Sequence, residues 1–259
     1  MSASLVGSEM CIRDSICTAQ ALLATMAGFY AVYHGPEGIR TIAERIHSIA
    51  VFLEKSINRL GYKQVNAQYF DTLRFALPDT ISAQQIRTIA LSKEVNLRYF
   101  KNGDVGMSID ETTDIAAVNV LLSIFAIAAG RDWEKASDVP MASSISAEMK
   151  RQSTYLTHEV FNKYHTETEM MRYIKRLDRK DISLAHSMIS LGSCTMKLNA
   201  AAEMLPLSRP EFMCMHPLVP EDQAEGYREL INNLSEELKV ITGFAGVSLQ
   251  PNSGAAGEY

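Results

Sequence analysis

The sequence predicts an α/β protein, in which a small α+β domain is followed by a mainly helical segment. Three observations lead to this prediction. Apolar residues recur at helical spacing over Glu37–Leu60, short strand-like runs surround a capped helix over Tyr69–Ile109, and a further helical pattern covers Pro220–Thr242. A polar, serine-rich stretch with a proline, Asp132–Ser153, precedes the last of these patterns and is typical of a linker.

The composition is that of an ordinary globular protein. The 259 residues are 47% hydrophobic and 21% charged, with a net charge of −5, which leaves enough apolar residues to form a core. No basic patch is present, which argues against nucleic acid as a partner. The longest apolar run, Ile115–Gly130, is interrupted by Asn119 and Ser123 and is shorter than the roughly 20 residues of a membrane helix.

The four cysteines are scattered along the chain at Cys11, Cys17, Cys194 and Cys214. They form no C-x-x-C pair, and no histidine lies at zinc-finger spacing from them. This distribution is typical of free thiols in a reducing compartment and predicts no metal site.

The first fifteen residues, Met1–Ser15, differ in character from the rest. They contain no long apolar run, no small-residue cleavage site and no amphipathic period, so they do not resemble a secretory signal. We interpret residues 1–15 as a non-native scar of sequence assembly, with a disordered tail as the alternative.

Two helices are expected next. Ile16–Tyr33 carries small and apolar residues on nearly every face, which predicts a buried helix that ends at His34-Gly35-Pro36. Glu37–Leu60 is predicted to be an amphipathic helix, which Gly61 ends. Its apolar face comprises Ile42, Ile46, Ile49, Leu53, Ile57 and Leu60.

A βαβ-like region follows. Tyr69–Ala76 is predicted to be a strand, with Phe70, Leu73 and Phe75 apolar. Ser82–Lys93 is predicted to be a helix, because Ser82 can cap it and Gln85 stands at the third position after the cap.

A hairpin and a closing helix complete the α+β domain. Val95–Tyr99 and Val105–Ile109 are expected to pair through the turn Lys101–Asp104. Its Asn-Gly step predicts a turn in which both central residues have positive φ. Thr112–Ala129 is then expected to be a helix.

The remainder combines helices with a loop of small residues. Thr166–Leu177 and Pro220–Thr242 are predicted to be helices, and Val247–Leu249 is predicted to be a short strand. Ser253-Gly254-Ala255 follows it, at the predicted start of another helix. Small residues let a backbone approach a ligand, and a helix N-terminus offers unpaired N–H groups. The loop is therefore a candidate phosphate site, with an ordinary tight turn as the alternative and Gln250 as a weaker neighbouring candidate.

Two further segments carry candidate functional residues. Ser193, Cys194 and Thr195 form a polar run between apolar flanks, so they must find hydrogen bonds or line a cavity. No paired base is visible for Cys194, so a structural thiol is the alternative to a nucleophile. His216 lies in a proline-rich stretch, where a hydrogen-bonded structural histidine is the alternative to a catalytic one.

The second half of the chain contains the segments GSCTMKLNAAAEMLPLS, PEF, HPLVPEDQAEGY and SLQPNSGAAGEY, in this order and spacing. They resemble the start of the C-terminal half of the glycine cleavage system P-protein family. ICTAQALLATMAGFYAVYHGPEG resembles the end of the large domain of the N-terminal half, and Tyr62–Ala129 resembles its small domain. HEVFNKYHTETEMMRYIKRLDRKDISLAHSMISLGSC is similar to the crossing between the halves, so the resemblance covers Ile16–Tyr259.

This resemblance implies a division of the chain into parts. Residues 16–36 would end the large domain of the N-terminal half, and residues 37–131 would form its small α+β domain. Residues 132–165 would be a linker, and residues 166–259 would begin the C-terminal half with its phosphate loop. The sequence departs from the family at Arg209, where tryptophan is usual, at Met213-Cys214, and at Ala256, where glutamine is frequent.

The resemblance also implies a function. It points to an internal fragment of a fold-type I enzyme that uses pyridoxal 5'-phosphate to decarboxylate glycine and passes the aminomethyl group to the lipoylated H-protein. The full-length enzyme would be a homodimer, located in the cytoplasm of a bacterium or in the mitochondrial matrix of a eukaryote. The implied oxidoreductase acts in glycine catabolism.

The resemblance assigns site residues one by one. Ser253, Gly254 and Ala255 would bind the cofactor phosphate, and the active site or its channel would include Ser193, Cys194, Thr195 and His216. The lysine that forms the Schiff base would lie beyond Tyr259, because Lys197 belongs to a different motif, so no catalytic residue is assigned. We therefore expect this fragment to be inactive alone and not to hold the cofactor.

Two alternatives are open. One is a non-catalytic binding or scaffold protein derived from the P-protein, and the other is an unrelated pyridoxal-phosphate transferase that shares only the loop. Sequencing past the codon for Tyr259 would separate a complete scaffold from an incomplete reading frame.

Overall fold

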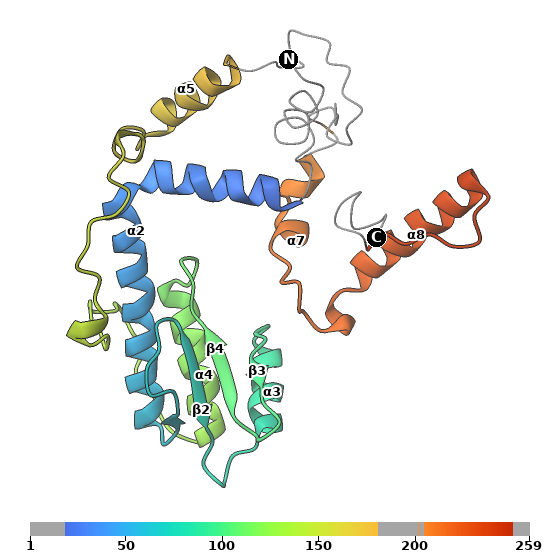
Figure 1. The fold of residues 1–259 in the computed structure, drawn as a ribbon. Coiled ribbons are helices and arrows are strands. Elements are labelled where there is room, and N and C mark those ends of the chain that lie inside the picture. The colour runs from blue at the N-terminus through green and yellow to red at the C-terminus, as the bar shows by residue number, and fades with distance from the viewer. Residues whose placement is uncertain (1–18, 181–201, 203–204, 251–259) are drawn as a thin grey trace. The chain divides into compact units, whose positions relative to one another are not determined.

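A computed structural model describes residues 19–180, 202 and 205–250 of the chain. The chain divides into two compact units (Figure 1). We call Ala31–Glu167 the α+β unit, and Met1–Tyr30 together with Thr168–Tyr259 the helical unit. The predicted combination of an α+β domain with a helical segment is confirmed.

The first described helix, α2 (Ala19–Arg59), is interrupted at the predicted place. Gly35 has φ 62° and ψ −177°, which is not helical, and Pro36 restarts the helix. A Cβ atom at Gly35 would lie 2.7 Å from the backbone oxygen of Phe161 and 2.7 Å from the ring of His165. The position therefore requires glycine for its φ angle and for the close approach of residues 161–165.

A four-stranded antiparallel sheet forms the other layer of the α+β unit. Its strands β1 (Lys63–Gln64), β2 (Thr72–Ala76), β3 (Arg98–Tyr99) and β4 (Val105–Ser108) lie in the order β1-β2-β4-β3. Strands β2 and β3 are each antiparallel to β4, so they run parallel to each other on either side of it. The connection from β2 through a helix to β3 is thus the predicted βαβ-like unit, with β4 inserted between its strands.

Helix α3 (Ala83–Ser92) begins as the sequence predicts. The Ser82 side chain accepts a hydrogen bond from the backbone N–H of Gln85 at 3.1 Å, which satisfies one of the unpaired donors of the first turn. Ile86 and Ala90 are buried on its inner face.

The β3–β4 hairpin is confirmed, but its predicted turn geometry is wrong. Gly103 has φ 92°, whereas Asn102 does not have a positive φ. The Gly103 N–H donates to the Phe100 carbonyl at 3.0 Å, and the Phe100 N–H donates to the Asp104 carbonyl at 2.9 Å. One left-handed glycine is therefore enough here, because the longer loop allows a bulge instead of the two-residue turn that needs two positive φ angles.

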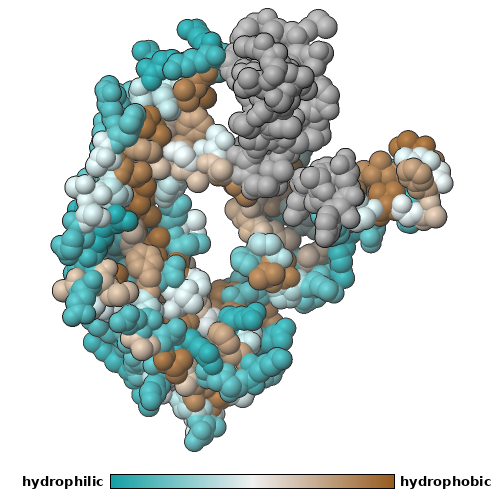
Figure 2. All heavy atoms as spheres, viewed as in Figure 1, coloured by the Kyte–Doolittle hydropathy of each residue, from teal (hydrophilic) through white to brown (hydrophobic). Residues whose placement is uncertain are grey.

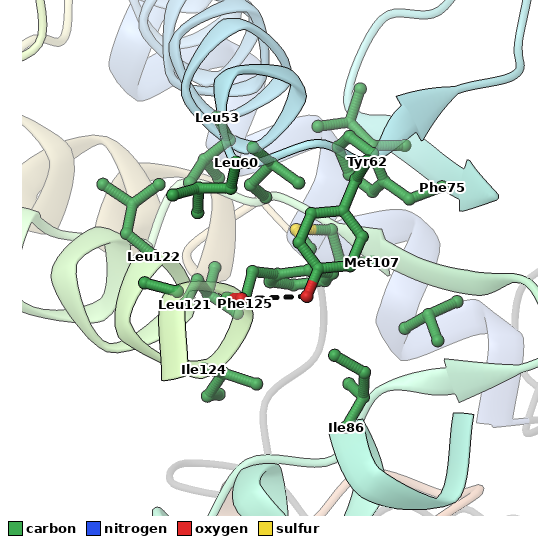
Figure 3. Packing of buried hydrophobic residues seen from close by; sticks show 14 of the residues in the cluster. Leu53, Leu60, Tyr62, Phe75, Ile86, Met107, Leu121, Leu122, Ile124 and Phe125 are labelled. Atoms are coloured by element: carbon green, nitrogen blue, oxygen red, sulfur yellow. Dashed lines mark hydrogen bonds between the residues drawn. The ribbon is translucent and has the colours of Figure 1, made fainter. Parts of the chain in front are cut away.

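The hydrophobic core lies between the sheet and the helices. Leu73, Phe75, Val105 and Met107 alternate along β2 and β4 toward it. Figure 3 shows Phe75 and Met107 within this cluster. Ile49, Leu53 and Ile57 from α2, and Leu60 just after it, pack in the same cluster, as their spacing predicts. Phe125 is completely buried, with its ring centroid 5.0 Å from that of Tyr62 and 5.7 Å from that of Phe75.

Helix α4 (Ile115–Ala129) supplies most of the remaining core. Its start differs from the predicted Thr112, because Asp114 caps the helix by accepting the Ala117 N–H at 2.8 Å. Its end agrees with the prediction: Gly130 has a left-handed conformation at φ 59°. Eight of its residues are buried.

The segment after α4 has little regular structure, yet it is attached to the core. Its only described helical turns are η2 (Ala147–Met149) and η3 (Glu159–Asn162). The Asn119 side chain exchanges two hydrogen bonds with Ala136, and Trp133 and Val139 pack against the core. The polar composition predicted a linker, but it did not reveal these attachments.

The helical unit contains α5 (Glu167–Asp178), α7 (Pro210–Met213) and α8 (Glu225–Thr242), with the short turns η4 (Leu205–Ser208) and η5 (Glu221–Gln223). Helix α5 is at its predicted place. Helix α8 begins five residues after the predicted Pro220, because Glu221–Gln223 forms a separate turn, and it ends at left-handed Gly243 as predicted.

Two predictions in the helical unit are wrong. The first turns of α2 were expected to be buried, but Leu23 and Met26 are 63% and 57% exposed. Val247–Leu249 was expected to be a strand, but these residues have no regular structure, because no described strand lies beside them to pair with their backbone groups. Figure 2 shows the apolar surface of α8, which includes Leu230, Leu234, Val240 and Ile241.

Within the described part of the chain, no helix has both the length and the apolar character that crossing a membrane requires.

Candidate functional site

Most predicted site residues lie outside the described residues. These are Ser193, Cys194 and Thr195 and the loop Ser253-Gly254-Ala255. The prediction that these residues lie close together therefore stays a prediction. His216 and Gln250 are described, and both are exposed.

His216 lies in a turn that follows α7, and its ring orientation is determined locally. Its Nδ1 accepts the backbone N–H of Leu218 at 3.0 Å, and its carbonyl accepts the N–H of Val219 at 3.0 Å. Because Nδ1 accepts, the proton of the neutral ring is on Nε2. The exposed imidazole can thus donate a hydrogen bond from Nε2 to a ligand, while the Leu218 contact holds the tautomer.

The segment that carries His216 is attached to α8. The Tyr227 hydroxyl donates to the Phe212 carbonyl at 2.7 Å, and the two rings meet edge to face with centroids 5.7 Å apart. Tyr227 lies in the first turn of α8, so this pair joins α7 to the start of that helix. Cys214, also in this segment, is an exposed free thiol.

Ser248 and Gln250, which lie just before the predicted phosphate loop, contact each other through a local hydrogen bond. The Ser248 hydroxyl accepts the backbone N–H of Gln250 at 3.4 Å. This is a turn-like contact within three residues, and it does not fix the direction of the Gln250 side chain.

A buried polar network in the α+β unit was not identified from the sequence. His47 is 2% exposed; its Nδ1 lies 2.7 Å from the Phe70 carbonyl and its Nε2 lies 2.9 Å from the backbone nitrogen of Ser144. The Tyr69 hydroxyl donates to Glu54 at 2.9 Å. Burial raises the pKa of Tyr69 to about 12; a hydrogen bond with the Ser144 side chain opposes this rise, and the contact with Glu54 adds to it. The sequence contains one indication of this network: His47 lies between Ile46 and Ile49 on the apolar side of a predicted helix.

This network does not have the arrangement of a serine nucleophile. The Ser144 hydroxyl lies 3.3 Å from His47 Nε2, but the shorter contact from the Ser144 N–H already occupies the lone pair of that nitrogen. A general base needs this lone pair to take a proton. Among the described residues, no group of three potential ligands could hold a metal ion.

The sequence is similar to known proteins along almost its whole length. The family model described as "Glycine cleavage system P-protein" matches residues 12–125. A relative from Bacteroides fragilis (strain YCH46), named "Glycine dehydrogenase (decarboxylating)", is 85% identical over 246 residues, which cover 95% of this chain and 26% of the relative.

More distant relatives carry the same name. The protein from Flavobacterium johnsoniae is 51% identical over 246 residues, and that from Vibrio parahaemolyticus is 49% identical over 250 residues. Each alignment covers 95% of this chain and 26% of the relative, so the chain spans about a quarter of the length of the curated relatives it matches. The resemblance inferred from the sequence motifs is confirmed.

Proposed function

We propose that this chain, whose sequence is similar to the glycine cleavage system P-protein along nearly all of its length, is part of a glycine-decarboxylating enzyme that uses pyridoxal phosphate. The observation that carries the proposal is the 85% identity over 95% of the chain to a protein named glycine dehydrogenase (decarboxylating). The fold of the described residues is compatible with it, since fold-type I enzymes of this family combine α+β and helical parts.

The donor groups of the predicted loop fit a phosphate. Ser253 offers a hydroxyl, and Gly254 and Ala255 offer backbone N–H groups without bulky side chains. When bound, pyridoxal phosphate supplies an electron-withdrawing ring that accepts the electron pair left on the glycine α-carbon as carbon dioxide departs. The role we assign to this loop is to hold the phosphate and so to fix the position of the ring.

The other predicted residues would surround the reacting groups. His216 presents an Nε2–H that can donate to an anionic or carbonyl oxygen, and its attachment through Phe212 and Tyr227 limits where that donor can lie. Ser193, Cys194 and Thr195 would contribute hydroxyl and thiol groups to the wall of the site or to the channel for the lipoyl arm. The transferred aminomethyl group would pass along this wall to the H-protein.

We also propose that the chain Met1–Tyr259 does not decarboxylate glycine by itself. The lysine that would bind the cofactor covalently is not assigned to any residue of this sequence, and without it the cofactor cannot be presented to glycine in the reactive form. The test is the exchange of labelled bicarbonate into the glycine carboxyl group with added H-protein. Exchange above background would contradict this proposal, and Lys197→Ala would then show whether Lys197 is the missing group.

The loop assignment is tested by cofactor titration of a full-length polypeptide that contains this sequence. Gly254→Val places a side chain where the phosphate must approach the backbone, and the affinity for pyridoxal phosphate should fall by about 2 kcal/mol or more. Ser253→Ala should have a smaller effect, about that of one hydrogen bond. Wild-type affinity in Gly254→Val would show that the loop is only a turn.

The proposed enzyme would be a cytoplasmic homodimer with glycine and the lipoylated H-protein as its partners. A second candidate function, a non-catalytic scaffold, is favoured only by the fact that no catalytic residue is assigned. Binding of the lipoylated H-protein by the chain, without exchange activity in any longer polypeptide that contains it, would support the scaffold.

A further inference from the structure

Residues 141–145 lie against α2 through contacts with two consecutive side chains of that helix. The Ser48 hydroxyl accepts the backbone N–H of Ala142 at 3.0 Å, and His47 Nε2 lies 2.9 Å from the backbone nitrogen of Ser144. All of these residues belong to the α+β unit. The segment has no regular secondary structure, so these side-chain contacts replace the backbone pairing that a strand would have.

The two partners of His47 define its protonation state. The Phe70 carbonyl is only an acceptor, so Nδ1, which lies 2.7 Å from it, must carry a proton. The Ser144 backbone N–H is only a donor, so Nε2 must be unprotonated to accept it. Both hydrogen bonds form only in the neutral ring with its proton on Nδ1.

The surroundings of the ring do not favour a positive charge. The ring is 2% exposed, and it stacks on Phe70 at 5.5 Å with an interplanar angle of 7°. The segment 141–145 contains no ionisable residue. Tyr69, whose ring centroid is 5.8 Å away, donates its hydroxyl proton to Glu54, and its raised pKa keeps it neutral.

The other ionisable residues nearby in the sequence make contacts elsewhere. Arg45 of α2 donates to the Thr113 carbonyl, and Asp71, which follows Phe70, accepts from the Thr72 hydroxyl. Glu44 of α2 contributes its backbone carbonyl to Ser48. No carboxylate contacts the His47 ring in the described part of the chain, so nothing there compensates a buried imidazolium.

We propose that His47 is a proton-controlled latch for residues 141–145. In its neutral form it accepts the Ser144 N–H and holds the segment on α2. Protonation places an N–H group on Nε2, which then faces the Ser144 N–H, so this contact is lost and Ser144 separates from the helix, while Ser48 still holds Ala142 and the core stays folded.

The His47–Ser144 contact also affects the chain that follows residues 141–145. Further along the chain, the Tyr155 hydroxyl donates to the Pro36 carbonyl at 2.6 Å, and His165 Nδ1 donates to the Tyr33 carbonyl at 2.7 Å. These bonds satisfy carbonyls at the interruption of α2, where Gly35 has a positive φ and leaves the helical pattern. Releasing Ser144 therefore loosens the segment between Ala142, which Ser48 still holds, and the contacts at the helix interruption.

The test is amide hydrogen exchange of the whole chain at about pH 7.5 and about pH 5, the range in which histidines change charge. After correction for the intrinsic exchange rate, protection of the Ser144 amide should fall by about tenfold or more, as expected for the loss of one hydrogen bond. Protection of the Phe75 and Val105 amides in the core strands should stay unchanged. Constant protection at Ser144, or parallel loss in the core strands, would overturn the proposal.

Two variants separate the latch from general acid effects. His47→Gln keeps an acceptor that does not titrate, so Ser144 should stay protected at both pH values. His158→Gln is the matched control, because the ring of exposed His158 accepts the N–H of Val160 in its own turn; it should leave the pH response of Ser144 unchanged. An equal fall in protection in His47→Gln would show that another group is the sensor.

Discussion

The α+β unit and the helical unit share the same kinds of apolar pattern but differ in what covers them. All buried residues in the described part of the chain lie between Val32 and Ala128, and they therefore belong to the α+β unit. Helix α4 buries eight of its residues, whereas α8 buries none, although Leu230, Ile231 and Leu234 recur at helical spacing. Periodicity therefore predicts a helix and its apolar face, but burial depends on a second element that packs against that face.

The largest difference should appear when core and surface side chains are truncated. Phe125→Ala removes a completely buried ring and should lower the free energy of unfolding by about 3–5 kcal/mol. Leu234→Ala, at a position that is 41% exposed, should change it by less than about 0.5 kcal/mol. Urea unfolding can be followed by circular dichroism and by the fluorescence of Trp133, the only tryptophan, which packs against the core. Similar losses for both variants would mean that α8 has a core of its own.

Two glycines give the next comparison. A Cβ atom at Gly106 of β4 would lie 2.9 Å from the Phe100 ring and 3.3 Å from the Leu73 carbonyl oxygen, so Gly106→Ala should destabilise the α+β unit by about 1–3 kcal/mol. Gly226 of α8 has no atom within 4 Å of its Cβ position, so Gly226→Ala should be neutral or should stabilise the helix by up to about 1 kcal/mol. The measurements are thermal unfolding for Gly106→Ala and helix content for Gly226→Ala. Destabilisation by Gly226→Ala would show that something approaches α8 closely.

Buried tyrosines should make the α+β unit sensitive to alkali. Burial raises the pKa of Tyr62 to about 12, and its hydroxyl donates to the Phe125 carbonyl at 2.8 Å. The unfolded chain loses this proton near the ordinary tyrosine pKa, so the stabilisation is complete below about pH 10 and is lost as the pH rises toward about 12. Tyr62→Phe should lower stability at neutral pH by about 1 kcal/mol and should flatten the alkaline slope.

The alkaline response is measured by unfolding at several pH values, with tyrosinate absorbance to follow ionisation. Tyr227 of the helical unit is the matched comparison, because its hydroxyl bond to Phe212 is exposed. Tyr227→Phe removes an exposed hydrogen bond and should lower the stability at neutral pH by less than Tyr62→Phe does. A wild-type slope in Tyr62→Phe would assign the alkaline response to other groups, such as Tyr69.

The smallest expected effects concern helix caps. Ser82→Ala removes the side-chain acceptor of the Gln85 N–H and should cost about 0.5–1 kcal/mol. The N-cap residue of α8 is Ala224, whose side chain cannot accept a hydrogen bond, so Ala224→Ser should stabilise the helix by a similar free energy and raise its helix content. Circular dichroism measures both. If Ala224→Ser changed the unfolding of the α+β unit, as detected by Trp133, the two units would not be energetically separate.

Local structure was largely predictable from the sequence. Ser82 and Gln85 marked the start of α3, Gly61, Gly130 and Gly243 followed the predicted helices, and the apolar spacing of α2 identified its core-facing side chains. These predictions succeeded because caps, stops and amphipathic faces depend on residues within one or two turns. The motifs shared with the P-protein family were likewise visible without any structure.

Other features depend on residues far apart in the sequence. The strand expected at Val247–Leu249 is absent and the first turns of α2 are exposed, because a strand needs a neighbouring strand and an apolar face needs a covering surface. The His47–Ser144 contact joins residues 97 positions apart, and no local pattern records it. The sequence by itself determined the helices, their ends and the family resemblance. Only the tertiary structure decided which faces are covered and in which form His47 is held, because burial and long-range hydrogen bonds exist only once distant segments meet.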